Sequence, residues 1–301
     1  MRYFIAIPTY NGGEIWEECA KGINDNAPDN TPVYIIDSGS SDRTLNIADK
    51  YNFEHISIKA KDFNHGGTRN MAIENNKGKY DFVIFLTQDA IPESGFVKNI
   101  LSAFDDPKVV CAYGRQLPHR KASKIAQHAR SFSYPEEGYV AELSDKESKG
   151  IKTVFMSNSF SAYRLDIFEK LGEFTSSTIL CEDMYYTAKA VLSGYKVAYV
   201  PDAIVRHSHN YSPVEEFKRY FDIGVFHADE PWIRKEFGGA EGEGKKFFIS
   251  EIKYLITQGF YLIPLAFINT AFKFLGYKIG GKYKKIPRAI IKKISMHKRF
   301  W

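Results

Sequence analysis

The sequence predicts an α/β fold in which a largely parallel sheet precedes a helical, basic C-terminal region. Short β-rich runs recur at residues 3–7, 33–36, 55–58, 82–86 and 109–113, with helix-like stretches between most of them. Parallel pairing requires crossover helices, and a spacing of roughly two dozen residues accommodates them. The pattern becomes helical from Pro213 onward. We therefore expect two parts, residues 1–212 and residues 213–301.

The elements between and after these strands follow from local patterns. The first crossover has apolar residues at helical spacing, and the second has a capping residue, Ser41 or Asp42, at its start. Glu182 and Asp183 open a further helix, because carboxylates favour a helix N-terminus, and a strand at 196–200 follows it. The charged, Gly-containing stretch 136–152 is expected to be a mobile loop.

Composition excludes several classes of protein. The chain has 301 residues, of which 44% are hydrophobic and 26% charged, which excludes a disordered or collagen-like chain. Cys19, Cys111 and Cys181 have neither metal-ligand spacing nor an even count, so a disulfide framework and a zinc site are not expected, and a reducing compartment fits. The apolar run 3–7 is too short for a signal peptide, so we expect no export.

Charge is distributed unevenly along the chain. Eleven of the 41 Lys and Arg residues lie after Glu251, and none of the 36 Asp and Glu residues does. The part up to Glu251 therefore carries about −6 and the remainder +11. The two parts are expected to contact different partners.

The basic region has two apolar features. Residues 254–272 are uncharged but interrupted by polar residues, Gly and Pro, which favours a packed or membrane-surface helix over a spanning one. Farther on, isoleucines recur every four residues opposite basic side chains, as in an amphipathic helix on anionic lipid; these are Ile286, Ile290 and Ile294 against Lys285, Arg288 and Lys292. We expect attachment to an anionic membrane surface and no nucleic-acid partner, because bulky apolar residues suit lipid better. A solvated charge run is the alternative.

Polar segments follow four of the predicted strands. Ligands of open α/β sheets bind beyond the carboxyl ends of the strands, so these segments should meet in one crevice. They are Pro8-Thr9-Tyr10-Asn11, residues 37–42, residues 62–70 and Thr87-Gln88-Asp89-Ala90.

Two positions in this crevice indicate chemistry. The glycines before Arg69 allow close approach of a ligand, and the guanidinium suits phosphate oxygens, so the segment predicts an anion site. A glycine turn with a surface arginine is the alternative. Asp89 ends a very apolar strand, where a carboxylate is costly unless a metal or polar ligand is present. Its alternative is to cap the next helix.

These residues resemble family 2 inverting glycosyltransferases with the GT-A fold, in the order and approximate spacing of their motifs. The segments 63–70 and 86–90 resemble the bacterial rhamnosyltransferase branch, and the resemblance covers about residues 3–240. It implies that residues 1–212 are the GT-A domain. It also implies a nucleotide-sugar site made of Pro8, Thr9, Tyr10, Asn11, Asp37, Ser40, Asp42, Gly67, Arg69, Asn70, Gln88 and Asp89.

The resemblance assigns roles within this site. Thr9, Tyr10, Asp37 and Asp42 would hold the base and ribose, and Arg69 the diphosphate. The chain departs from the family where Ser38 replaces a common Asp of the nucleotide loop.

The resemblance also implies a metal cofactor. Asp89 matches the last Asp of the family's Asp-x-Asp motif, and Thr87 replaces the first. One carboxylate, water and the diphosphate can still complete an octahedral Mg²⁺ or Mn²⁺ shell. His207 lies where such folds often supply a late ligand, although His207 and His209 are equally compatible with a structural role.

Asp183 is the candidate general base. Inverting transfer needs a carboxylate to take the proton of the acceptor hydroxyl as its oxygen attacks the anomeric carbon. Glu182 is the competing candidate, and the alternative is that both acids only complement a helix dipole. Asn158, Glu182 and Trp232 are the candidate acceptor-side residues.

The expected function is transfer of a deoxyhexose, L-rhamnose from dTDP-β-L-rhamnose, to a lipid-linked acceptor in O-antigen or capsule synthesis. The expected location is peripheral, on the cytoplasmic side of the bacterial inner membrane. A noncatalytic nucleotide-sugar-binding subunit and an enzyme for another nucleotide sugar are the alternatives. A sugar-phosphate nucleotidyltransferase fits poorly, because its Gly-Thr-Arg loop follows the first strand, whereas here residues 67–69 follow the third.

Overall fold

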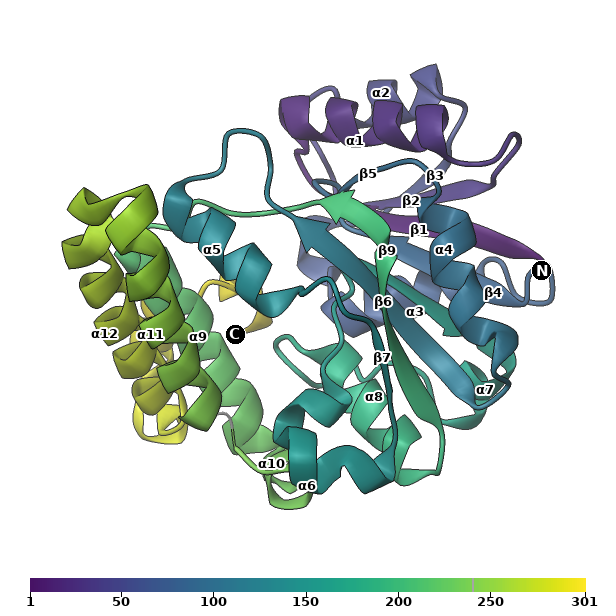
Figure 1. The fold of residues 1–301 in the computed structure, drawn as a ribbon. Helices are drawn as coiled ribbons and strands as arrows, with labels where there is room; N and C mark the ends of the chain where they lie inside the picture. The colour runs from purple at the N-terminus through teal and green to yellow at the C-terminus, as the bar shows by residue number, and fades with distance from the viewer. Residues whose placement is uncertain (240) are drawn as a thin grey trace.

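The computed structural model describes residues 1–239 and 241–301 and contains one mixed nine-stranded sheet (Figure 1). The strand order is β3-β2-β1-β4-β8-β6-β9-β5, and β7 pairs with β9. The strands are β1 (Tyr3–Thr9), β2 (Val33–Asp37), β3 (Glu54–Ser57), β4 (Phe82–Leu86), β5 (Ile91–Pro92), β6 (Val109–Leu117), β7 (Tyr139–Ala141), β8 (Phe160–Arg164) and β9 (Lys196–Arg206).

The predicted α/β class is confirmed, and the six predicted strands are present as β1, β2, β3, β4, β6 and β9. β1, β2, β3 and β4 pair in parallel, as the crossover spacing predicts. The sequence pattern missed β8, which lies antiparallel between β4 and β6 at the centre of the sheet. Four of its five residues are buried, so it has no alternation of apolar and polar positions to reveal it. β9 also extends past Pro201 to Arg206.

Helices cover both faces of the sheet. In β4, Phe82, Ile84 and Leu86 pack with α1, α2 and α4, whereas Val83 and Phe85 pack with α3, α7 and α8. This alternation follows from the two-residue period of a strand. These helices are α1 (Gly13–Asn26), α2 (Thr44–Lys50), α3 (His65–Glu74), α4 (Phe96–Ser102), α7 (Leu165–Lys170) and α8 (Glu182–Leu192).

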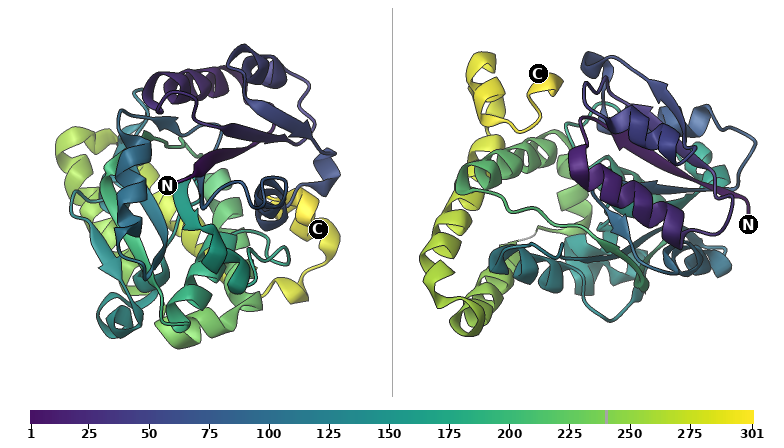
Figure 2. Two further views of the ribbon diagram at one scale, coloured as in Figure 1. Left: turned by 90° about the vertical axis from the view of Figure 1, so that its right-hand side faces the viewer. Right: turned by 90° about the horizontal axis from the view of Figure 1, so that it is seen from above.

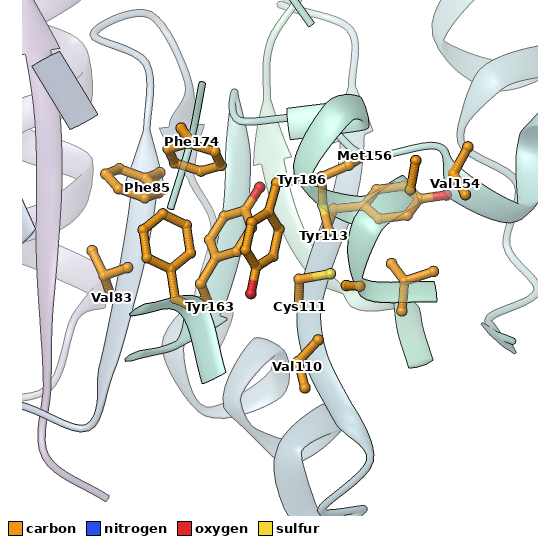
Figure 3. Packing of buried hydrophobic residues seen from close by; sticks show 14 of the residues in the cluster. Val83, Phe85, Val110, Cys111, Tyr113, Val154, Met156, Tyr163, Phe174 and Tyr186 are labelled. Atoms are coloured by element: carbon orange, nitrogen blue, oxygen red, sulfur yellow. The ribbon is translucent and has the colours of Figure 1, made fainter. Parts of the chain in front are cut away.

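An aromatic cluster connects the sheet to α8 (Figure 3). The ring of Tyr163 on β8 lies 5.8 Å from Phe85, 5.1 Å from Phe174 and 5.4 Å from Tyr186. Its hydroxyl donates to Oδ1 of Asn158 at 2.7 Å. The hydrophobic core therefore fixes one of the polar residues predicted for the site.

The stretch 136–152 forms defined secondary structure, which corrects the expectation of a mobile loop. β7 pairs antiparallel with β9. A short helix, α6 (Lys146–Lys149), follows it, between 3₁₀ helices at Leu143–Asp145 and Gly150–Val154. Helix α5 (Lys124–Ser133) precedes the stretch. The buried side chains of Ala141, Ile151 and Val154 belong to the core, which explains why this charged stretch is ordered.

The region after Pro213 is helical, as predicted, and wraps one side of the sheet domain (Figures 1 and 2). Helices α9 and α12 pack closely at two glycines of α12, where a larger residue would not fit. A Cβ on Gly276 would lie 2.3 Å from the Phe217 oxygen, and a Cβ on Gly280 would lie 2.0 Å from the Phe221 oxygen. The helices are α9 (Pro213–Asp229), α10 (Pro231–Phe237), α11 (Glu241–Gln258), α12 (Ile263–Gly280) and α13 (Arg288–Ile294).

The other side of α12 is apolar and exposed. By length and composition the segment Phe260–Gly280 could cross a membrane, and only 17% of it is buried. The predicted amphipathic helix differs from expectation. It spans only Arg288–Ile294, and Ile286 and Ile294 pack against the core while Ile290 is exposed. The exposed apolar surface is therefore on α12 rather than on α13.

Candidate active site

Asp37 holds the ends of β1 and β2 together. Its buried carboxylate accepts from the Thr9 hydroxyl at 3.0 Å, the Gly39 N–H at 2.9 Å and the Ser40 N–H at 2.8 Å. Asp42 acts similarly, accepting from the Gly13 N–H at 2.9 Å. These predicted nucleotide-site residues do lie together, and the two aspartates shape the loops through hydrogen bonds within the protein.

Pro8 and Thr9 are the last two residues of β1, and Tyr10 follows them at the same edge of the sheet. Gln88, which follows β4, holds the Tyr10 backbone in place. Gln88 Oε1 accepts from the Tyr10 N–H at 2.8 Å, and its amide nitrogen donates to the Tyr10 carbonyl at 3.2 Å. Asn11, with φ 44°, accepts from the Ser41 N–H at 2.8 Å. The Tyr10 side chain is exposed at the edge where these strands end.

The two glycines before Arg69 lie in the first turn of α3 rather than in a ligand-binding loop. The Gly67 N–H donates to the capping Asn64 side chain at 2.8 Å. A Cβ on Gly66 would lie 2.1 Å from the Thr175 oxygen, so this glycine permits close packing of α3 on that loop. Asn70 also holds the loop, donating to the Phe174 carbonyl at 2.9 Å.

Arg69 is buried and paired with Glu182, which excludes the alternative of a surface arginine. The two charged groups are 3.0 Å apart, and both side chains are 5% exposed. The same guanidinium nitrogen, Nη1, donates to the His65 carbonyl at 2.9 Å. The structure thus brings Arg69 to the candidate base segment instead of to a solvent-facing surface.

Asp183 lies beside this ion pair at the start of α8. Cys181 precedes the pair of acids and has a left-handed backbone conformation, φ 59°, which few residues other than glycine adopt. The Asp183 carboxylate accepts from the Asn158 N–H at 3.0 Å, while the Asn158 side chain donates to Glu182 at 2.9 Å. Asn158, predicted on the acceptor side, therefore contacts both acids.

The two acids have opposite pKa shifts. Burial raises the pKa of Asp183, and the neighbouring Glu182 charge raises it further. The pKa of Glu182 is lowered despite its burial, because the charges of Arg69 and His65 favour its ionised form. The pair is thus separated into a charged Glu182 and an Asp183 suited to accept a proton near neutral pH.

Asp89 lies with two histidines from the segment after β9. Its Oδ2 is 3.4 Å from His207 Nε2 and 3.7 Å from His209 Nε2, and all three ligand atoms lie within 4.8 Å of one another. The pKa of Asp89 is lowered although burial alone would raise it, because His207, and His209 once it is protonated in acid, favour the ionised carboxylate. Burial lowers the pKa of His209 to about 4, so its imidazole is neutral at physiological pH.

His209 was not selected as a ligand from the sequence, although its spacing could have indicated it. Side chains two residues apart in an extended segment share a side, and His207 and His209 both follow the end of β9. The three residues fit a divalent cation, because neutral imidazoles and a carboxylate are its usual protein ligands.

Gln116 connects this cluster to the base segment. Its Oε1 accepts from Arg130 at 2.6 Å and lies 2.8 Å from His207 Nδ1, which therefore carries the proton and leaves Nε2 free for a ligand. Its amide nitrogen donates to the Ser157 hydroxyl at 2.8 Å, next to Asn158. Asp89 and Asp183 are consequently linked through one chain of polar contacts.

Trp232 is partly buried and packs against Tyr185 of α8. Its ring meets Tyr185 at 5.5 Å, and its N–H donates to Glu230 at 2.8 Å. At one position where the chain departs from the family, the Ser38 hydroxyl is buried and has no hydrogen-bond partner among the described residues. At the other, the Thr87 side chain interacts with the Asp89 carboxylate and helps to lower its pKa.

Comparison with known proteins identifies the class. The model of the Glycosyl transferase family 2 matches residues 4–172. The chain belongs to this family. The O-antigen chain rhamnosyltransferase RfbN of Salmonella typhimurium is 48% identical over 303 residues, which cover 100% of this chain and 96% of RfbN. WbaN of Salmonella anatum, an O-antigen chain rhamnosyltransferase, is 48% identical over 99% of this chain and 95% of its own length. The resemblance to the rhamnosyltransferase branch is confirmed.

Solved structures show the same fold. TarS residues 1–349 of S. aureus has a TM-score of 0.54 at 17% identity, covering 95% of this chain and 91% of that one. The mannosyltransferase PcManGT of Pyrobaculum calidifontis, solved with GDP-Man and Mn²⁺, has a TM-score of 0.57 at 16% identity, covering 99% and 84%. The GT-A fold is thereby confirmed.

Proposed function

We propose that this glycosyltransferase transfers L-rhamnose from dTDP-β-L-rhamnose to a lipid-linked O-antigen acceptor, with inversion at the anomeric carbon. The observation that carries the rhamnosyl transfer is the 48% identity to two O-antigen chain rhamnosyltransferases over essentially the whole chain. The dTDP carrier and the stereochemistry rest on the resemblance of the motifs. A capsule-type acceptor is the second candidate.

Asp183 is the proposed general base. It would take the proton of the acceptor hydroxyl while that oxygen attacks the anomeric carbon, opposite the departing nucleoside diphosphate. Its raised pKa makes it a better proton acceptor than an ordinary aspartate. Glu182, the competing candidate, is occupied by Arg69 and Asn158, so it is proposed to position and tune Asp183 instead.

Asp89, His207 and His209 would hold the divalent cation, and two imidazoles favour Mn²⁺ over Mg²⁺. Such a cation supplies charge stabilisation for the departing diphosphate. The hydrogen bond between His207 Nδ1 and Gln116 supports the assignment, because it leaves His207 Nε2, the ring nitrogen beside Asp89, to bind the cation.

Tyr10, its partner Gln88 and the loops closed by Asp37 and Asp42 are the proposed nucleotide side of the site. The aspartates would act by holding the loops in shape, since their oxygens are used within the protein. The Tyr10 side chain is 41% exposed and is the residue proposed to contact the nucleotide.

We also infer peripheral attachment to the cytoplasmic side of the inner membrane through α12 and the 3₁₀ helix that precedes it, Phe260–Leu262. Phe260 and Tyr261 are 73% and 70% exposed, and Phe267, Phe274 and Leu275 are also exposed. The close contact of α12 with α9 at glycines disfavours its leaving the fold to span a bilayer. The basic residues after Glu251 would add attraction to anionic lipid at about 1 kcal/mol each.

A donor panel tests the proposal. The full chain is assayed with dTDP-rhamnose, UDP-sugars and GDP-sugars, with and without Mn²⁺, and the product linkage is determined. Rhamnose transfer with inversion supports the proposal, and preference for another donor contradicts it. Asp183→Asn serves as the inactive control, and its binding of nucleotide separates loss of chemistry from loss of fold. Nucleotide binding without turnover by the wild type would instead indicate a noncatalytic subunit.

A further inference from the structure

Residues 295–301, here called the C-terminal strap, return to the first 65 residues of the chain. Figure 2 shows this yellow end of the chain beside the blue N-terminal third. Hydrogen bonds connect the strap to Tyr10, Ala60 and His65. These three residues follow β1 and β3 and begin α3, at the edge where parallel strands present ligand sites.

The strap is anchored at both ends. Asp222, buried on α9, accepts from the Met296 N–H at 2.9 Å and the His297 N–H at 3.0 Å. At the other end, the Trp301 ring lies 5.4 Å from Tyr283. The conformation between these anchors is therefore fixed by the helical region.

Arg299 is the strap residue that faces the nucleotide side. Its guanidinium lies 4.5 Å from the Tyr10 ring centre and donates to the Tyr10 hydroxyl at 2.9 Å. A longer contact of 3.4 Å reaches the Ala60 carbonyl. Among residues 1–239 and 241–301, Arg299 has no acidic partner, although a surface arginine readily finds one. Its charge and several N–H donors remain available.

A second contact fixes the strap against α3. His297 Nδ1 lies 3.3 Å from His65 Nε2, with the rings 4.6 Å apart. His65 is also the residue whose carbonyl accepts from Arg69. The strap therefore bridges from the Tyr10 edge to the segment that holds Glu182.

We propose that Arg299 is a donor-binding residue and that its guanidinium contacts the phosphates of the bound nucleoside diphosphate. This inference rests on the proposed function. Arg69 is buried and pairs with Glu182, whereas Arg299 is exposed, so Arg299 is the guanidinium better placed to assist the proposed metal ion at the phosphates. A planar guanidinium with free donors suits phosphate oxygens. Tyr10 holds that guanidinium at the ligand edge, and Asp222 positions the backbone that carries it.

Calorimetric titration of the full chain with dTDP, UDP and GDP, in the presence of Mn²⁺, tests the proposal. Arg299→Ala should weaken binding of the preferred nucleotide by about tenfold or more, and Arg299→Lys should restore it only in part. Lys298→Ala is the matched control, because it removes one exposed charge from the same strap. Its affinity should change less than about twofold.

Asp222→Ala provides a second arm. It should weaken nucleotide binding as Arg299→Ala does, because Asp222 positions the backbone that carries Arg299. The Asp222→Ala/Arg299→Ala double variant should bind the nucleotide no more weakly than Arg299→Ala, because both changes remove the same contact between Arg299 and the nucleotide. If Asp222→Ala does not fold, the Arg299 arm decides alone.

The outcomes separate the two proposals. A wild type that binds one nucleotide and an Arg299→Ala variant with unchanged or tighter binding would overturn the strap inference while leaving rhamnosyl transfer intact. Tighter binding would show that Arg299 occupies the ligand's place. Equal losses in Arg299→Ala and Lys298→Ala would also overturn it, since general charge would suffice. A wild type that binds no nucleotide would overturn both.

Discussion

Replacing Arg69 by methionine should destabilise the fold strongly, because it leaves the Glu182 carboxylate buried without its ion-pair partner. At 3.0 Å and an effective dielectric constant of about 20, the two charges attract by roughly 5–6 kcal/mol. Desolvation offsets part of this attraction, and breaking such buried pairs costs about 3–5 kcal/mol. We expect a loss of that size in the free energy of unfolding at neutral pH.

Urea denaturation of wild type, Arg69→Met and the double variant Arg69→Met/Glu182→Gln measures this loss. The double variant should recover much of it, because no unpaired charge remains and a glutamine oxygen can still accept from Asn158. Lys77→Met is the control: its ion pair with Glu74 is exposed and should be worth less than about 1 kcal/mol.

The reasoning fails if Arg69→Met retains the wild-type free energy of unfolding but loses nucleotide affinity. That result would place Arg69 at the diphosphate, as the sequence motif alone implied. Equal destabilisation in the single and double variants would show that the loss of the guanidinium's hydrogen bond to the His65 carbonyl, and not the unpaired Glu182 charge, is what destabilises the fold.

Three further changes have expected outcomes. Asp183 must be ionised to accept a proton, so the transfer rate should fall as the pH drops through its raised pKa. Glu182→Gln removes the charge that raises this pKa and should move the acid limb of the pH–rate profile to lower pH. An acid limb that does not move would contradict the coupling of the two acids. His209→Gln should raise the Mn²⁺ concentration that gives half-maximal activity by about tenfold or more, and an unchanged metal titration would remove this ligand. Gly66→Ala should lower the melting temperature, because its Cβ would lie 2.1 Å from the Thr175 oxygen, and a melting curve like that of the wild type would refute the contact.

The parallel half of the sheet could be predicted because local periodicity specifies it. The runs that became β1 and β4 are apolar, bounded by turn residues and separated by helical lengths. β8 could not be predicted, because its five residues, which include Ser161 and Arg164, form a central strand only by pairing with β4 and β6. Long-range pairing of this kind leaves no local signal.

The sequence predicted which candidate residues lie near one another better than it predicted their contacts. The strand-end rule brought Asp37, Asp89 and Tyr10 to one edge, and the motif order indicated Asp183. The partner of Arg69 could not be predicted, because Glu182 is 113 positions away in the sequence and both residues are polar enough to suit a surface. The strap contact between Arg299 and Tyr10 spans 289 positions, and charge composition indicated only a basic tail.

The buried ion pair also explains how two adjacent carboxylates acquire different roles. Glu182 and Asp183 share one desolvated segment, where ionising both would be costly. Arg69 and His65 favour the charge on Glu182, and that charge in turn raises the pKa of Asp183. Asp183 therefore binds a proton more readily than Glu182 does, and its carboxylate also accepts a hydrogen bond from the Asn158 N–H. Removing Arg69 should therefore let the two acids share the proton, so that the acid limb of the pH–rate profile changes shape as well as position. Stability and base strength thus depend on the same guanidinium.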